Sequence, residues 1–213
     1  MRIPCLAALG ASVLGSLTAA ARVVDDDAAS FRYSLANLAD QPASADPAPG
    51  PAAAPAFGAA GSRWWGIGAG AAHDFDGSTD TDVNASFRYF LARDVEFGAE
   101  GALWNFNQPG DNAFGVSAVM IFRWHFYNEG KWSFYADAGI GLLGASNSVP
   151  DGGTSFDFMP RIGAGLTRQI TEDGTRLEVG VRWHHVSNAR IFGDSNNPAR
   201  DAPMLYAGLI FPF

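Results

Sequence analysis

From Arg63 to the end of the chain, apolar residues alternate with small or polar ones at every second position. Successive side chains of a β-strand point to opposite faces, so this period indicates strands whose two faces meet different surroundings. No stretch reaches the roughly 18 consecutive apolar residues of a transmembrane helix. The alternation recurs in eight segments, at about 63–73, 81–91, 94–106, 113–126, 131–145, 155–169, 175–188 and 203–213. We therefore expect an all-β fold.

The two faces of these strands differ in kind. In segment 113–126 one face carries large apolar side chains, namely Phe114, Val116, Ala118, Met120, Phe122, Trp124 and Phe126. The opposite faces of the second to seventh segments mix glycine and serine with a balanced set of charges, Arg88, Glu96, Glu100, Arg123, Asp137, Arg161, Glu178 and Arg182. Charges that share a cavity must neutralise each other. This pattern predicts a narrow, filled lumen and an exterior in lipid, which requires a closed sheet because an open edge cannot exist in hydrocarbon. The expected fold is an eight-stranded antiparallel transmembrane β-barrel.

The connections between the segments point to a bacterial outer membrane. Those after the second, fourth and sixth segments are tight, whereas the others are longer and rich in Gly, Asp, Asn and Pro. Outer-membrane barrels show this alternation of short periplasmic turns and longer external loops, with aromatic girdles at both interfaces. The girdle candidates are Trp65, Trp124, Trp132 and Trp183. A terminal aromatic residue, Phe213, resembles the signal read by outer-membrane assembly machinery. The alternative is a soluble lipid carrier, which would hold its large apolar side chains inside.

The first 62 residues differ from the rest of the chain. Residues 1–21 combine Arg2, an apolar run and a small-residue site at Ala19-Ala20-Ala21, which predicts a cleavable signal peptide. Residues 22–62 become rich in Pro and Ala and are expected to form a periplasmic segment and linker, followed by the barrel at 63–213. The only cysteine, Cys5, leaves with the signal, so no disulfide or thiol chemistry is expected. We also expect no cofactor and no metal.

The charge balance bears on partners. The chain carries 22 acidic and 14 basic residues, with a formal net charge of −8. Nucleic-acid binding depends mainly on Lys and Arg at the phosphates. Nucleic acid is therefore not expected as a partner, and the sequence leaves homodimer formation open.

Two residues that could take part in catalysis lie at the end of the seventh segment. His185 and Ser187 lie two positions apart in a strand and so project from the same face. A histidine beside a serine is the minimum for base-activated attack on an acyl carbonyl. The parity of the segment puts both residues on the lipid face, where polar groups are costly and usually functional. Counted from a periplasmic N-terminus, the strand ends at the external rim, so the pair would face the outer leaflet and an acyl ester of a membrane lipid.

An acid should orient the histidine, as in a Ser-His-Asp triad. Asp201 is the first choice because it shares the parity of the apolar face of the last segment. Asp194, in the middle of the preceding loop, is the alternative.

The segment His185-Val186-Ser187-Asn188-Ala189, with Asn197-Pro198 and an acid after it, resembles the lipid A 3-O-deacylases of the PagL type. These are eight-stranded outer-membrane barrels that remove an ester-linked acyl chain from lipid A. The resemblance implies His185 as general base, Ser187 as nucleophile, and Asp201 where the family usually has Glu. It also implies that Asn188 helps to form the oxyanion site, and that lipid A of lipopolysaccharide is the partner. Members commonly have Gly where this chain has Arg190.

Two arginines flank the external loop. Arg190 and Arg200 are candidate ligands for the lipid A phosphates, because the forked donors of Arg suit phosphate. The competing function is a non-enzymatic structural or adhesive barrel, in which the side chains of His185 and Ser187 would diverge or Ser187 would point into the lumen.

Overall fold

The computed structural model describes residues 56–193 and 197–213, so the predicted signal peptide and most of the predicted linker lie outside the described residues. Within the described part, no helix is long and apolar enough to cross a membrane. The strands are β1 (Arg63–His73), β2 (Thr79–Ala92), β3 (Val95–Asn107), β4 (Ala113–Glu129), β5 (Trp132–Ala145), β6 (Phe156–Phe158), β7 (Arg161–Gln169), β8 (Arg176–Val186) and β9 (Arg200–Pro212).

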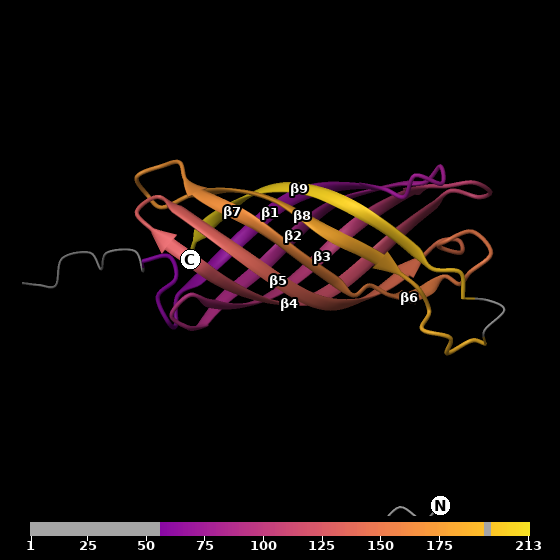
Figure 1. The fold of residues 1–213 in the computed structure, drawn as a ribbon, viewed down its shortest axis with the longest axis horizontal. Helices are drawn as coiled ribbons and strands as arrows, with labels where there is room; N and C mark the ends of the chain where they lie inside the picture. The colour runs from indigo at the N-terminus through magenta and orange to yellow at the C-terminus, as the bar shows by residue number, and fades with distance from the viewer. Residues whose placement is uncertain (1–55, 194–196) are drawn as a thin grey trace, which may run out of the picture. The chain divides into compact units, whose positions relative to one another are not determined.

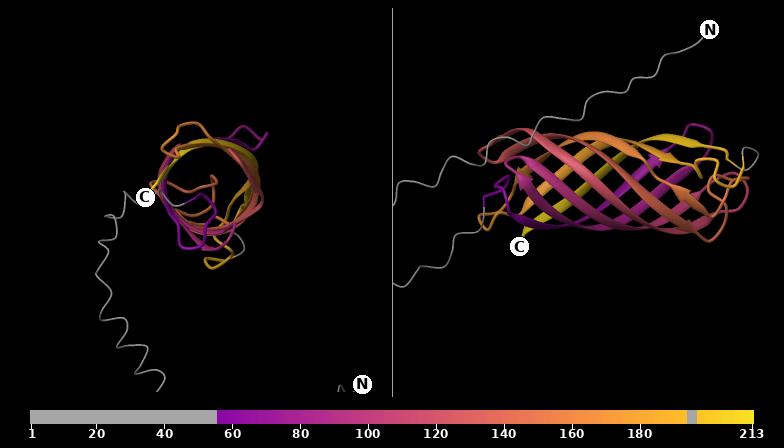
Figure 2. Two further views of the ribbon diagram at one scale, coloured as in Figure 1. Left: turned by 90° about the vertical axis from the view of Figure 1, so that its left-hand side faces the viewer. Right: turned by 90° about the horizontal axis from the view of Figure 1, so that it is seen from below.

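The strands close into a barrel (Figure 1). The order around the sheet is β4-β3-β2-β1-β9-β8-β7-β5, and β4 pairs with β5 to complete the ring. The seam between the first and last strands runs from the pair Trp64–Pro212 to the pair Ala72–Met204. Both β6 and β7 pair with β5, so together they take the place of one strand, and eight strand positions surround the lumen. The view along the axis shows the closed ring (Figure 2). The predicted fold class is confirmed.

The sixth segment differs from its prediction. We expected one strand over residues 155–169, but the structure divides it into β6 and β7 at Met159 and Pro160. Proline has no N–H to donate to a ladder and is confined to edges and irregular positions of a sheet. Met159 keeps its backbone bonds to Gly141, at 2.9 and 3.1 Å, so the wall of the barrel stays continuous there.

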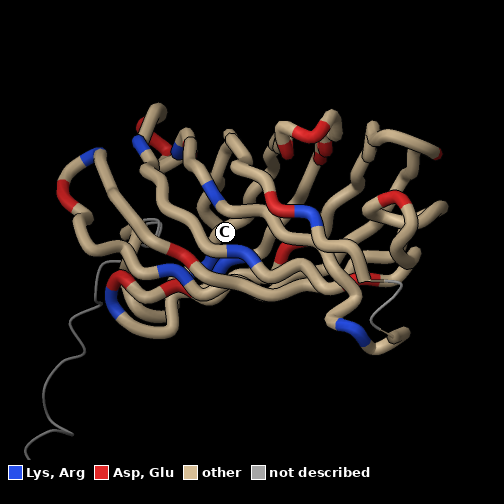
Figure 3. Tube along the Cα trace, turned by 45° about the vertical axis from the view of Figure 1, so that its right-hand side comes forward, with Lys and Arg blue, Asp and Glu red and all other residues tan. Residues whose placement is uncertain are grey.

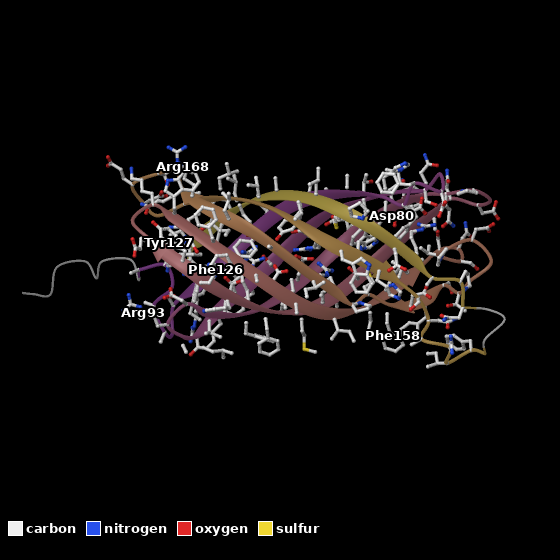
Figure 4. The ribbon with its side chains drawn as sticks, viewed as in Figure 1. Asp80, Arg93, Phe126, Tyr127, Phe158 and Arg168 are labelled. Atoms are coloured by element: carbon white, nitrogen blue, oxygen red, sulfur yellow. The ribbon has the colours of Figure 1, made fainter. Side chains whose placement is uncertain are left out.

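The large apolar side chains face outward. On β4 the exposed fraction is 69% for Phe114 and 60% for Trp124, and the four predicted girdle tryptophans are all at least 40% exposed. Figure 4 shows side chains standing outward along the whole wall. This confirms the predicted orientation of the two faces and excludes the soluble carrier, whose large apolar side chains would be inside.

The lumen holds the charged residues in ion pairs. Glu178 lies 2.5 Å from Arg88 and 3.1 Å from Arg123, and Arg123 also binds Asp137 at 2.8 Å. Figure 3 shows that acidic and basic positions recur on the strands of the barrel as well as in its loops. All eight charged residues expected on the inner face are buried. The charges of the interior are therefore paired, as predicted, and apolar side chains such as Trp104 and Phe106 also pack inside the lumen.

The two ends of the barrel are built differently. Figure 4 places Arg93 and Arg168 beside the short turns at one end, and Asp80 and Phe158 at the end with the long loops. At the short-turn end Phe57 packs edge-to-face on Trp64 and on His125, with ring centroids 5.0 and 5.1 Å apart. The last residues of the predicted linker therefore pack against the barrel.

Candidate functional site

Three polar side chains meet on the outer wall near the long-loop end. The Oγ of Ser187 lies 2.8 Å from Nε2 of His185, and Nδ1 of the same ring lies 2.8 Å from Oδ1 of Asp201. The side chain of His185 is 17% exposed and that of Asp201 is 55% exposed. A serine, an imidazole and a carboxylate linked in this order have the arrangement of a nucleophile, its base and the group that orients the base.

The register of β8 and β9 brings the acid to the histidine. His185 and Asp201 are direct cross-strand partners. Directly opposed residues of an antiparallel pair have Cβ atoms only about 5 Å apart, so the short side chain of Asp is sufficient. The structure thus brings Asp201 to His185, while the alternative, Asp194, lies outside the described residues.

Ser187 follows the last residue of β8 and is held by its backbone. It forms an isolated bridge with Phe158 of β6, in which Phe158 N donates to Ser187 O at 2.7 Å and Ser187 N donates to Phe158 O at 3.2 Å. The chain then turns sharply, with φ of 52° at Ala189 and 64° at Arg190. These are left-handed values that favour glycine, which gives a physical reason for Gly at position 190 in the resemblance noted above.

Asn188 is part of this turn. It is 1% exposed, and its Oδ1 accepts a hydrogen bond from the backbone N–H of Arg190 at 2.8 Å. The amide Oδ1 is an acceptor, so only the Nδ2 group of this side chain has the chemistry to donate to an oxyanion.

An open apolar groove lies on the outer wall beside the three residues. Its volume is about 470 Å³, and strands β7, β8 and β9 form it. Its outward-facing lining consists of Ile162, Ala164, Val181, Trp183, Asp201 and Pro203. The carboxylate that binds His185 is thus at the border of an apolar surface that faces away from the lumen. No three His, Cys, Asp or Glu side chains gather as a metal site within the described ranges.

The comparison with protein families decides which family this is. The model of the family described as lipid A 3-O-deacylase (PagL) matches residues 60–209. The chain belongs to the PagL family. Its members are outer-membrane ester hydrolases, and the resemblance seen in the sequence is confirmed.

Solved structures agree with this assignment at the level of the fold. The outer-membrane enzyme PagL matches with a TM-score of 0.55 and 20% identity, over 70% of this chain and 99% of that one. Neisserial surface protein A (NspA) matches with a TM-score of 0.52 and 17% identity, over 71% and 97%. The N-terminal barrel domain of Pseudomonas aeruginosa OprF matches at 0.50 and 22%, over 72% and 99%. No curated protein matches the chain.

Arg200 is not where we expected it in this PagL family member. Its side chain points into the lumen, is 4% exposed, and donates to Asp80 and to Gln108 at 2.5 Å each. The reason is parity, because Arg200 precedes Asp201 in β9 and so projects from the opposite face. The expectation that Arg200 binds a lipid phosphate is therefore wrong. Arg190 is exposed on the loop, and its phosphate role stays a prediction.

Sequence reasoning missed a second Ser-His-acid constellation. His125 lies 2.6 Å from Ser133 Oγ through Nδ1 and 3.1 Å from Glu96 through Nε2. Ser133 is 0% exposed, and Phe57 packs against the His125 ring. A substrate cannot reach this serine in the structure. The distance from serine to histidine is similar at Ser133 and at Ser187, but only Ser187 lies on the outer wall. The residues are far apart in sequence, and no local motif could have revealed them.

Proposed function

We propose that this chain hydrolyses an ester-linked acyl chain of lipid A at the outer leaflet, with Ser187 as nucleophile, His185 as general base and Asp201 as the acid. The observation that carries this proposal is the pair of 2.8 Å contacts that join the three side chains beside an apolar groove on the outer wall. The interior constellation at His125 lacks both the access and the groove. The family supports lipid A as the substrate.

The geometry supports a two-step acyl transfer. Ser187 Oγ attacks the ester carbonyl while His185 Nε2 takes its proton, and Asp201 stabilises the imidazolium that forms. Collapse of the tetrahedral intermediate breaks the ester bond, and His185 returns the proton to the leaving sugar oxygen. His185 then deprotonates a water that attacks the acyl-serine, and it returns this proton to Ser187 Oγ as the bond between Oγ and the acyl carbon breaks, which releases the fatty acid and restores Ser187.

The direction of β8 supports a site at the outer leaflet. The strand begins after a short turn and ends among the long loops, and short turns are periplasmic in outer-membrane barrels. His185 and Ser187 stand at its far end on the apolar side. An acyl chain of lipid A would enter the groove sideways from the leaflet, with its ester carbonyl at Ser187.

Further contacts belong to the same proposal. Asn188 Nδ2 would donate to the oxyanion of the tetrahedral intermediate, and Arg190 would bind a phosphate of the lipid A sugar. Recognition by the outer-membrane assembly machinery and homodimer formation stay predictions from the sequence.

The test compares substitutions at Ser187, in the outer site, with a substitution at Ser133, in the interior constellation. Purified protein in detergent micelles is incubated with lipopolysaccharide, and released fatty acid is measured by mass spectrometry. We expect Ser187→Ala and His185→Ala to release no fatty acid above the protein-free background, whereas the control Ser133→Ala keeps the wild-type rate if it stays folded. Release by Ser187→Ala at the wild-type rate would eliminate Ser187 as the nucleophile. Loss of activity in a folded Ser133→Ala variant would eliminate the assignment to the outer site.

A further inference from the structure

Asp201 receives two hydrogen bonds on one oxygen. Its Oδ1 lies 2.8 Å from Nδ1 of His185 and accepts a second bond from the indole Nε1–H of Trp183, also at 2.8 Å. The rings of Trp183 and His185 are 5.0 Å apart with an angle of 37° between their planes. Both donors therefore come from β8 and reach the same oxygen of the carboxylate on β9.

Register explains why these three side chains converge. Trp183 and His185 are two residues apart on β8 and point outward together. Asp201 is directly opposite His185, and Pro203 is directly opposite Trp183, which makes Asp201 the diagonal neighbour of the tryptophan. Diagonal neighbours in a sheet lie within reach of long aromatic side chains.

The carboxylate needs such support more than the rest of the site does. The side chain of Asp201 is 55% exposed, whereas that of His185 is 17% exposed. An exposed carboxylate can rotate and exchange its partners, and misplacement of a group that orients the base costs rate. An indole N–H is a donor only, so it can stabilise the carboxylate but cannot take the proton of the imidazole.

We propose that Trp183 is a positioning residue that fixes the Asp201 carboxylate against His185 through its indole N–H, in addition to its place on the lipid face. This inference rests on the proposed function, because it acts through the same His185 and Ser187. It separates two contributions of Trp183: the ring, which lines the groove, and the N–H, which binds the acid.

Trp183→Phe separates them, because it removes the donor and keeps an aromatic ring in the groove. We expect kcat for fatty-acid release from lipopolysaccharide to fall about tenfold, as for the loss of one hydrogen bond to a charged group, with KM within about twofold. The matched control is Trp124→Phe, at another exposed tryptophan on the outer wall of β4, which should leave both constants unchanged. A rise in KM with unchanged kcat would assign only the groove role to Trp183 and overturn the proposal.

A second pair of variants keeps the proposal falsifiable if Trp183→Phe also loosens the barrel. In an Asp201→Ala background the indole has no carboxylate to position, so adding Trp183→Phe should not lower the residual kcat further. An equal tenfold loss in both backgrounds would show a structural effect and overturn the inference. Failure of the proposed function looks different, because Ser187→Ala would then remain active whatever the residue at position 183.

Discussion

Asp201 shows what a single residue contributes to this site. The sequence left Asp201 and Asp194 as alternatives, since parity across a loop and a proline is not a secure guide. The β8–β9 register places Asp201 opposite His185, so a side chain one methylene shorter than Glu still reaches the imidazole. The partnership of Trp183 with the same carboxylate could not be predicted, because a tryptophan near the end of a barrel strand is already explained by an aromatic girdle.

The turn after Ser187 leads to a prediction about a single residue, Ala189. Ala189 has φ of 52°, a left-handed conformation that costs a residue with a Cβ roughly 1–2 kcal/mol more than glycine. We therefore expect Ala189→Gly to raise the free energy of unfolding by about 1 kcal/mol, measured by denaturant titration in detergent micelles. The control is Ala69→Gly in β1, where glycine should lower it by about 0.5–1 kcal/mol. Equal destabilisation by both changes would refute the strain at Ala189.

At the scale of elements, periodicity was a sound guide to strands and a poor guide to interruptions. Alternation in 113–126 predicted both the strand and its outward face, because burial on one side repeats at every second residue. The same pattern could not predict the break at Pro160, since Met159 keeps the ladder with Gly141 and the residues on both sides keep alternating. That break matters to the site, because the short β6 it creates supplies Phe158, whose backbone holds Ser187.

The groove over β7, β8 and β9 leads to a prediction about substrate binding. Ala164 is a small exposed residue in its lining, beside Ile162 and Val181. Ala164→Phe should fill part of the roughly 470 Å³ volume and raise KM for lipopolysaccharide about tenfold or more, while the rate with a short-chain soluble ester stays near that of the wild type. Ala69→Phe, which adds the same ring to the outer face of β1, serves as the control. An unchanged KM for lipopolysaccharide in Ala164→Phe would show that the acyl chain lies elsewhere.

For the whole molecule, stability and chemistry lie on opposite faces of one wall. The inner face is closed by ion pairs such as Glu178 with Arg88 and Arg123. The outer face carries the apolar rows and the three-residue site. The sequence indicated this division because equal numbers of acidic and basic residues fall on one face of the strands. It could not indicate which acid pairs with which base, since those pairs depend on the register between distant strands.

The lumen network makes a prediction about the stability of the barrel. Glu178 pairs with Arg88 and Arg123, and it also accepts a hydrogen bond from Tyr135 Oη at 3.0 Å. Its removal therefore leaves the two buried guanidinium groups without this partner. Glu178→Ala should lower the free energy of unfolding by about 3–5 kcal/mol. Glu172→Ala in the exposed β7–β8 turn is the control and should change it by less than about 0.5 kcal/mol. Similar unfolding midpoints for the two variants would contradict an essential role for the ion pairs.

The most direct test of the central claim is mass spectrometry of lipid A from Gram-negative cells that display the protein in their outer membrane. With wild-type protein or Ser133→Ala, we predict a lipid A species lighter by one ester-linked hydroxy fatty acid. With Ser187→Ala present in the outer membrane at the same level, only the unmodified lipid A should remain. The same mass loss with Ser187→Ala as with the wild type would contradict the account.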